Sequence, residues 1–583
     1  MARHAIVMVW RATGSLTVVW GLILVGQGLI PAAQALFLRN MVNRLVDSRA
    51  WTNIAPPASG VAALWILGQI LSSAQSWVKA VQAERVRDEV HRLIHLQALR
   101  LDLSFYDHPE SYDLLYRAQI DAIVQPLALL ENLGLVAQNG LGFLVLAGIL
   151  WMYARWLPIL LICTAIPGLI SVSRHTLRDH DWQQRNTVQE RRARYLDWTI
   201  TEQGSAAELR LFNIGSYHRE AFEKVRRALS EGKLRLVRAG AIVELKAGLL
   251  SWSGSLFGLG WMLHQTLVGR NQLGDLLLCF QAFQQSQLLL RSLLEEAGKI
   301  YRSLLFVENV YQFLKIETVI GSEHHLEQIP SFKSSITFEG VSFTYPGGSR
   351  CALNDFDLDI PHGKVTALVG YNGAGKSTLI KLLCRFYDPS KGRILVDGVD
   401  LRKFDPEALR SQISVLFQEP VHYHASVADN IVFGDIGRGW DKARIRKAAE
   451  DAGALASIER LQGGFEAQLG KWFGGAELST GEWQRIALAR AFFRQAPLVI
   501  LDEPTSAMDS WAELDWLSRF RMLTQGRTAL MITHRFTTAM YADVIHVLDQ
   551  GRVVEFGTHR ELIANGGHYA SSWSAQMREI SHA

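Results

Sequence analysis

The stretch GYNGAGKS at residues 370–377 decides how the second half of the chain folds. An apolar run, 365–369, precedes it, and a run typical of a helix, 378–386, follows it. The glycines allow backbone N–H groups to surround phosphate oxygens at the start of a helix, Lys376 adds a positive charge, and Ser377 can bind Mg²⁺. This order of strand, loop and helix predicts an α/β domain that binds phosphate groups. Alone, the motif has the alternative reading of a glycine-rich turn.

A pair of acids follows a second apolar strand. Residues 498–501 (LVIL) lead into Asp502 and Glu503. An acid at the carboxyl end of a strand beside a phosphate loop is placed to coordinate Mg²⁺, and a second acid can orient or deprotonate a water molecule. Neighbouring strand residues point to opposite faces, so the strand must end before both carboxylates can reach one site, as Pro504 suggests. The alternative is a surface acid pair.

The first half of the chain has the pattern of a membrane protein. The 583 residues are 49% hydrophobic and 20% charged, which excludes disorder, collagen and coiled coil, and the net charge of +4 gives no signal for nucleic acid. Four cysteines lie far apart and indicate neither zinc nor a disulfide framework.

Residues 15–38 carry no charge, although Arg3 and Arg11 before them leave a signal peptide as the alternative. Six membrane spans are expected, because further apolar runs lie at 60–80, 133–153, 157–172, 239–263 and 273–294.

Charge between the runs predicts the orientation. Lysine and arginine concentrate in the two long gaps, so the N-terminus and both long segments should be cytoplasmic. Residues 79–100 and 183–235 are typical of helices that project beyond the bilayer, interrupted near 104–119 and 206–222. We therefore expect an all-α polytopic transmembrane domain with long cytoplasmic helical extensions at 1–316, a polar linker at 317–330, and an α/β P-loop domain at 331–583.

With both motifs in place, residues 331–583 resemble an ATP-binding cassette, and the whole chain resembles an ABC half-transporter of the exporter fold. The sequence LSTGE at 478–482 stands where the family has its LSGGQ signature. Gln418 matches the Q-loop, SAMD at 506–509 the D-loop, and His534 the switch histidine. Tyr345 matches the aromatic residue on which the family stacks adenine. In this family the interruptions, read as short helices at 106–115 and 208–217, couple the cassettes to the membrane helices; the alternative is an ordinary helix kink at Pro109 or Gly215.

The resemblance implies ATP and Mg²⁺ as cofactors and gives each site residue a role. Glu503 would be the general base, with His534 and Gln418 as further catalytic residues. Ser377, Gln418 and Asp502 would hold Mg²⁺, Asp502 through a water molecule. The residues expected to contact nucleotide are Tyr345, Gly370, Asn372, Gly373, Gly375, Lys376, Ser377, Thr378, Ser479, Gly481 and Asp509.

Two departures from the signature, Thr480 for glycine and Glu482 for glutamine, are read as tolerated variation, with a weakened site in a heterodimer as the alternative. One cassette implies a second half-transporter, and the intact set of site residues favours a homodimer. The expected function is ATP-driven export of an amphipathic small molecule, lipid or peptide across the bacterial cytoplasmic membrane. Import of a metal-chelate and a P-loop ATPase without transport are the alternatives. Gln281, Gln284 and Gln285 share one helix face and favour a polar translocation cavity over hydrogen bonds between helices.

Overall fold

The computed structural model describes residues 2–48, 50–321, 332–371, 373–504 and 516–582, apart from 518, 521–523 and 525. The described chain forms two compact units. The first contains residues 1–99 and 113–316, and the second contains residues 100–112 and 317–583. The second unit is therefore built from two segments that lie far apart in the sequence.

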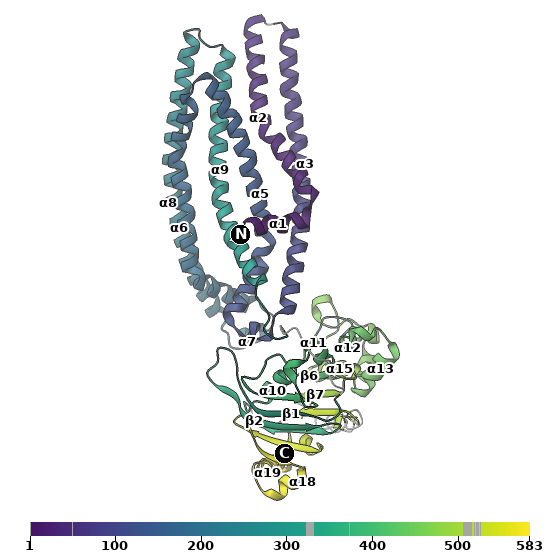
Figure 1. Ribbon diagram of the computed structural model, residues 1–583. Helices are drawn as coiled ribbons and strands as arrows, with labels where there is room; N and C mark the ends of the chain where they lie inside the picture. The colour runs from purple at the N-terminus through teal and green to yellow at the C-terminus, as the bar shows by residue number, and fades with distance from the viewer. Residues whose placement is uncertain are drawn as a thin grey trace. The chain divides into compact units, whose positions relative to one another are not determined.

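The first unit consists of long helices that run side by side (Figure 1). Among the described residues, six of its helices are between 34 and 53 residues long. Its helices are α1 (Ala2–Thr13), α2 (Ser15–Ser48), α3 (Trp51–Arg100), α5 (Pro109–Tyr153), α6 (Trp156–Thr201), α7 (Ala206–Leu211), α8 (Gly215–Leu267) and α9 (Leu273–Leu314).

Each expected membrane span falls inside one of the six long helices. Within the described residues, three stretches are long and apolar enough to cross a membrane: Ser15–Asp47, Trp51–Arg100 and Leu127–Tyr153. A shorter apolar stretch is Trp156–Gly168 in α6. The α8 and α9 spans contain more polar residues, and the total of six spans stays a prediction.

The helix bounds expected at the two interruptions are wrong in detail. α4 (Leu103–Asp107) ends before His108, which has an extended backbone, and α5 begins at Pro109. Proline is accepted in the first turn of a helix but disfavours helical backbone in the residue before it, and here His108 is extended, so no single helix covers 106–115. In the second interruption α7 ends at Leu211, and Asn213, with a φ of 51°, separates it from α8.

The second unit contains two sheets (Figure 1). The four-stranded sheet has the order β2-β1-β4-β5 and is antiparallel. The six-stranded sheet has the order β10-β9-β3-β8-β7-β6, and only the β9–β10 pair of its described strands is antiparallel. The strands are β1 (Ser335–Thr344), β2 (Cys351–Pro361), β3 (Val365–Gly370), β4 (Lys391–Val396), β5 (Val399–Asp400), β6 (Ile413–Leu416), β7 (Leu498–Asp502), β8 (Thr528–Ile532), β9 (Val544–Asp549) and β10 (Arg552–Gly557).

Helices and the smaller sheet bury the central parallel strands on both faces. In β7 every residue is buried: Val499 and Leu501 join one hydrophobic cluster, whereas Leu498 and Ile500 join the other. Continuous apolar runs such as LVIL are typical of such doubly covered strands, so the α/β expectation is confirmed. The helices of this unit are α4, α10 (Lys376–Leu383), α11 (Pro406–Ser411), α12 (Val427–Val432), α13 (Lys442–Asp451), α14 (Leu455–Arg460), α15 (Thr480–Phe493), α17 (Phe536–Ala539), α18 (His559–Asn565) and α19 (His568–His582).

Candidate nucleotide-binding site

The loop after β3 has the geometry of a phosphate-binding turn. β3 ends at Gly370 and α10 begins at Lys376, so the loop delivers backbone N–H groups to the start of a helix. Gly375 has a φ of 102°, and a Cβ there would lie 2.7 Å from the carbonyl oxygen of Ala352. Only glycine fits this position without displacing β2.

Lys376 is buried beside the loop, at 7% exposure. Its Nζ donates to the carbonyl oxygen of Gly370 at 2.5 Å and more weakly to that of Tyr371 at 3.4 Å. Burial lowers the pKa of Lys376, and the charges of Glu503 and Asp502 act in the opposite direction. The ammonium is therefore held by neutral oxygens, which a phosphate group could replace.

The two acids reach one site because the strand ends between them. β7 ends at Asp502, and Glu503 has a φ of 49°, which turns its side chain away from the alternation of the strand. Its N–H donates to the carbonyl oxygen of Ile532 at 2.9 Å, which fixes this left-handed backbone. Burial and the neighbouring Glu503 raise the pKa of Asp502 to about 6, while Lys376 lowers it.

Two side chains from other strand ends hold the carboxylate of Glu503. His534 follows β8, and its Nδ1 lies 3.2 Å from Oε1 of Glu503. Gln418 follows β6, and its Nε2 donates to Oε2 at 3.2 Å. Carboxyl ends of parallel strands meet at one edge of a sheet, which is where ligands bind in such folds.

A cavity of about 830 Å³ joins these groups, a volume in the usual range for small-molecule sites. Tyr345 lines it, and the Tyr345 hydroxyl lies 3.1 Å from Oγ1 of Thr378 at the start of α10. The predicted residues that line the cavity are Tyr345, Gly370, Gly373, Gly375, Lys376, Ser377, Thr378, Gln418, Asp502, Glu503 and His534.

Sequence reasoning missed one wall of the cavity. Residues of α19, including His568 and Gln576, line it, and Oε1 of Gln576 accepts the N–H of Phe536 at 2.8 Å. α19 reaches this place only through tertiary packing, and nothing in its sequence signals the contact.

Among the described residues, Ser479 and Gly481 do not line this cavity. They begin α15, at another part of the unit. Asn372 and Asp509 lie outside the described residues.

Glu482 has a structural role that explains its departure from the signature. Its Oε2 accepts the backbone N–H of Ser479 at 3.0 Å and the Ser479 hydroxyl at 2.9 Å, a capping box at the start of α15. Its Oε1 lies 3.2 Å from Arg460. These hydrogen bonds to Ser479 and the charge of Arg460 lower the pKa of Glu482, so it stays ionised.

Comparison with known proteins assigns the chain to a family. Residues 353–506 match the family described as ABC transporter. The ATP-dependent lipid A-core flippase of Aromatoleum aromaticum is 33% identical over 487 residues, which are 82% of this chain and 78% of the flippase. The chain belongs to the ABC transporter family. Another transporter of the family, the subtilin transport ATP-binding protein of Bacillus subtilis, is 27% identical over 92% of this chain and 88% of its own length.

The fold is that of an ABC exporter. A solved structure of a bacterial Atm1-family ABC exporter with ATP bound superposes with a TM-score of 0.80, at 24% identity, over 96% of this chain and 98% of that one. Together these findings show a multi-pass half-transporter of the exporter fold that dimerises in a bilayer and couples ATP hydrolysis to export. Import of a metal-chelate is not favoured.

Replacing Asp502 by asparagine should stabilise the nucleotide-free protein at pH 8. The folded-state pKa of about 6 lies above the ordinary 3.8, so ionisation of Asp502 costs stability progressively as the pH rises through this window. The full cost is roughly 3 kcal/mol, and it falls by about half at pH 5. Thermal unfolding of wild type and D502N at both pH values measures this cost. If D502N is stabilised equally at pH 5 and pH 8, the raised pKa of Asp502 is contradicted.

Replacing Glu482 by alanine should destabilise the protein by about 1 kcal/mol, because the capping box and the Arg460 ion pair are both lost. Glutamine should cost less, because its side-chain oxygen still accepts the Ser479 N–H. Thermal unfolding of E482A and E482Q distinguishes them. Equal losses would mean that the charge, rather than the cap, holds this helix start.

Proposed function

We propose that two identical copies of this chain form an exporter in a bacterial cytoplasmic membrane, with the ATPase units and the N-terminus cytoplasmic, and that it moves an amphipathic substrate. The observation that carries the proposal is the convergence of Lys376, Asp502 and Glu503 on one cavity. The cation of Lys376 matches the phosphates of a nucleoside triphosphate, and the acids Asp502 and Glu503 match its metal ion and the attacking water.

Within the cavity we assign roles by reach and chemistry. The N–H groups of the 370–377 loop and Lys376 bind the phosphates, and Tyr345 stacks on the adenine. Glu503 accepts the proton of the attacking water, since its carboxylate faces the cavity between His534 and Gln418. His534 steadies the γ-phosphate, and His534 and Gln418 fix the rotamer of the base.

The donor set fits Mg²⁺, which takes oxygen ligands. Ser377, Gln418 and Asp502 supply oxygens around the cavity, and the raised pKa of Asp502 marks a buried carboxylate without sufficient positive charge beside it. When bound, Mg²⁺ would neutralise charge on the transferring phosphate. Asp502, ionised beside it, would orient a metal-bound water.

The position of α15 supports dimerisation. Ser479 and Gly481, which meet the γ-phosphate in related exporters, do not line the cavity of their own chain among the described residues. We assign them to the ATP site of the second copy. The residues assigned above to phosphate binding, Mg²⁺ binding, proton transfer and the signature are all present in this one sequence. Two identical copies can therefore supply both complete ATP sites.

A second cavity supports an amphipathic substrate. It holds about 460 Å³ between α6, α8 and α9. Gln284 and Gln287 give it polar walls, whereas Trp252 and Leu288 give it apolar ones. Gln287 also accepts from Ser255 at 3.0 Å, so hydrogen bonding between helices and a polar cavity coexist here. Among the described residues, Gln281 and Gln285 do not line it. Two of the relatives are named for a lipid, lipid A-core, and for subtilin, which agrees with a lipid or peptide substrate.

Glu503→Gln should leave ATP binding intact and lower the ATPase rate at least about a hundredfold, because the amide cannot take up a proton. The variant should also accumulate as a closed, ATP-bound dimer. Glu459→Gln, which alters an exposed acid paired with Arg446, is the matched control and should keep the wild-type rate. Steady-state hydrolysis and retention of radiolabelled ATP measure both effects; near-normal turnover in E503Q would remove Glu503 as the base.

The homodimer is tested with the chain purified without any partner. We expect a dimer mass in detergent and cooperative ATP hydrolysis. Thr480→Gly removes a β-branched side chain at the start of α15 and should change the rate less than about threefold if the signature is merely varied. A monomer that hydrolyses ATP only after a different half-transporter is added would refute the homodimer, and a large gain in T480G would indicate a weakened site.

A further inference from the structure

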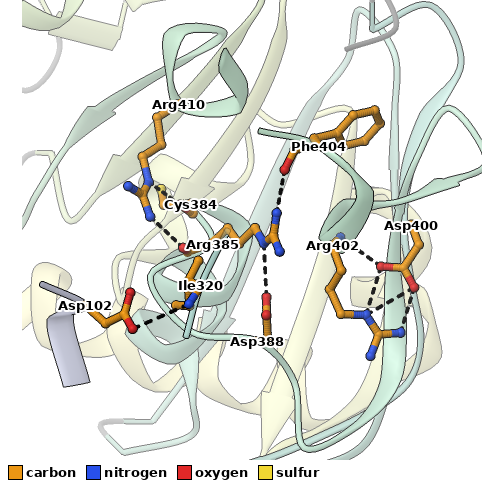
Figure 2. A network of polar contacts seen from close by, with 9 residues as sticks. All are labelled: Asp102, Ile320, Cys384, Arg385, Asp388, Asp400, Arg402, Phe404 and Arg410. Carbon is orange, nitrogen blue, oxygen red and sulfur yellow. Dashed lines mark hydrogen bonds and ion pairs between the residues drawn. The ribbon is translucent and has the colours of Figure 1, made fainter. Parts of the chain in front are cut away.

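The short helix α4 is bound to the same compact unit as the cavity. Phe105 is buried, and Leu103 packs on the hydrophobic cluster that includes Phe343. Asp102, just before α4, accepts the backbone N–H group of Val319 at 2.7 Å. It also accepts that of Ile320 at 3.4 Å, the bond drawn in Figure 2. The start of α4 is therefore tied to the segment that leads into β1.

Tyr387 contacts the other end of α4. Its side chain is 4% exposed, and its hydroxyl donates to Oδ2 of Asp107, the last residue of α4. Burial and Asp107 raise the pKa of the Tyr387 hydroxyl, which keeps it a donor across the physiological range.

The same ring contacts the residue assigned to adenine. The centroids of the Tyr387 and Tyr345 rings are 5.5 Å apart, and their planes meet at 80°, an edge-to-face contact. Nζ of Lys381 lies 5.0 Å from the Tyr345 centroid and 5.8 Å from that of Tyr387. Beyond Tyr345, a Cβ on Gly347 would lie 3.1 Å from the imidazole of His108, so the next turn also approaches the end of α4.

Two arginines, the buried Arg385 and the partly buried Arg410, hold the loop that leads to Tyr387, and Figure 2 shows their hydrogen bonds. Arg385, 2% exposed with a φ of 48°, donates to the carbonyl oxygen of Phe404 at 2.5 Å and to Asp388 at 3.2 Å. Arg410 donates to the carbonyl oxygens of Cys384 at 3.0 Å and Arg385 at 2.7 Å. The backbone just before Tyr387 is held by Arg410, and the side chain of Asp388 just after it is held by Arg385, so this loop is restrained next to the Tyr387 ring.

We propose that Tyr387 is a positioning residue that couples adenine binding at Tyr345 to the position of α4 through Asp107. The proposal rests on the function proposed above, in which Tyr345 stacks on the base. It adds that the base, and not only the phosphates, acts on α4. Coupling between two sites is reciprocal, so a displacement of α4 must change the affinity for the base by the same factor.

The test compares two ligands on the full-length protein in lipid nanodiscs. The β,γ-imido analogue of ATP carries the base, whereas inorganic tripolyphosphate carries only the phosphates; both are used with Mg²⁺ at saturation. Deuterium uptake is followed in the segments 100–112 and 370–383. We expect both ligands to protect 370–383, but only the imido analogue to slow exchange in 100–112, by at least about fivefold, the lower end of typical site coupling.

Variants locate the path. Tyr387→Phe keeps the ring contact with Tyr345 and removes the hydroxyl, so it should abolish protection of 100–112 while the affinity for the imido analogue changes by no more than that coupling factor. Asp107→Ala should do the same, and Asp107→Asn, which keeps an acceptor oxygen, should retain most of the protection. Tyr569→Phe is the matched control, because it removes another buried tyrosine hydroxyl, one bonded to His559 at 2.8 Å.

Two results would overturn the coupling: equal protection of 100–112 by tripolyphosphate, or full protection in both Y387F and D107A. If Y387F does not fold, D107A alone decides, since Asp107 is exposed. Failure of the nucleotide site itself would look different, because the imido analogue would then leave 370–383 unprotected.

Discussion

Uncompensated charge at the edge of a parallel sheet is the constraint on which the second unit depends. Lys376 and Asp502 are both buried, and neither has a bonded counter-ion of its own among the described residues: the lysine is held by carbonyl oxygens, and the carboxyl has a raised pKa. The sheet places them there because β3 and β7 flank β8 and end at the same edge. Such a cavity is costly to the folded protein until a ligand of matching charge enters it. Burying these two charges lowers the stability of the ligand-free fold, and the same charges favour binding of the ligand.

Local sequence predicts the parts of the site that are built by neighbouring residues. The phosphate loop, the acids Asp502 and Glu503 at the end of β7, and the break between them could be read directly, because strand, turn and helix follow one another within a few residues. The wall formed by α19 could not, since it reaches the cavity only through packing of distant elements. The end of α4 was readable in principle from Pro109, whose effect on His108 is local.

The signature departures show why a motif read by identity alone misleads. Glutamate at position 482 looks like the loss of a family glutamine, yet it closes a capping box with Ser479 and meets Arg460. That pair joins α15 to the end of α14, residues 22 apart in the sequence, so no local pattern reveals it. Glu482 caps the start of α15 and adds a negative charge there, so the departure from the signature has a structural role.

The attachment of α4 also has a consequence for how the protein is made. Asp107 and Tyr387 are separated by 280 residues. At about 5–20 residues per second, a ribosome needs roughly 15–55 s to synthesise the chain between them. During that time Leu103 lacks the hydrophobic cluster on which it packs, because that cluster is formed by residues from 332 to 548. The second unit thus cannot complete its contact with α4 until the chain as far as Tyr387 has been made, so a segment synthesised early depends on a partner synthesised late.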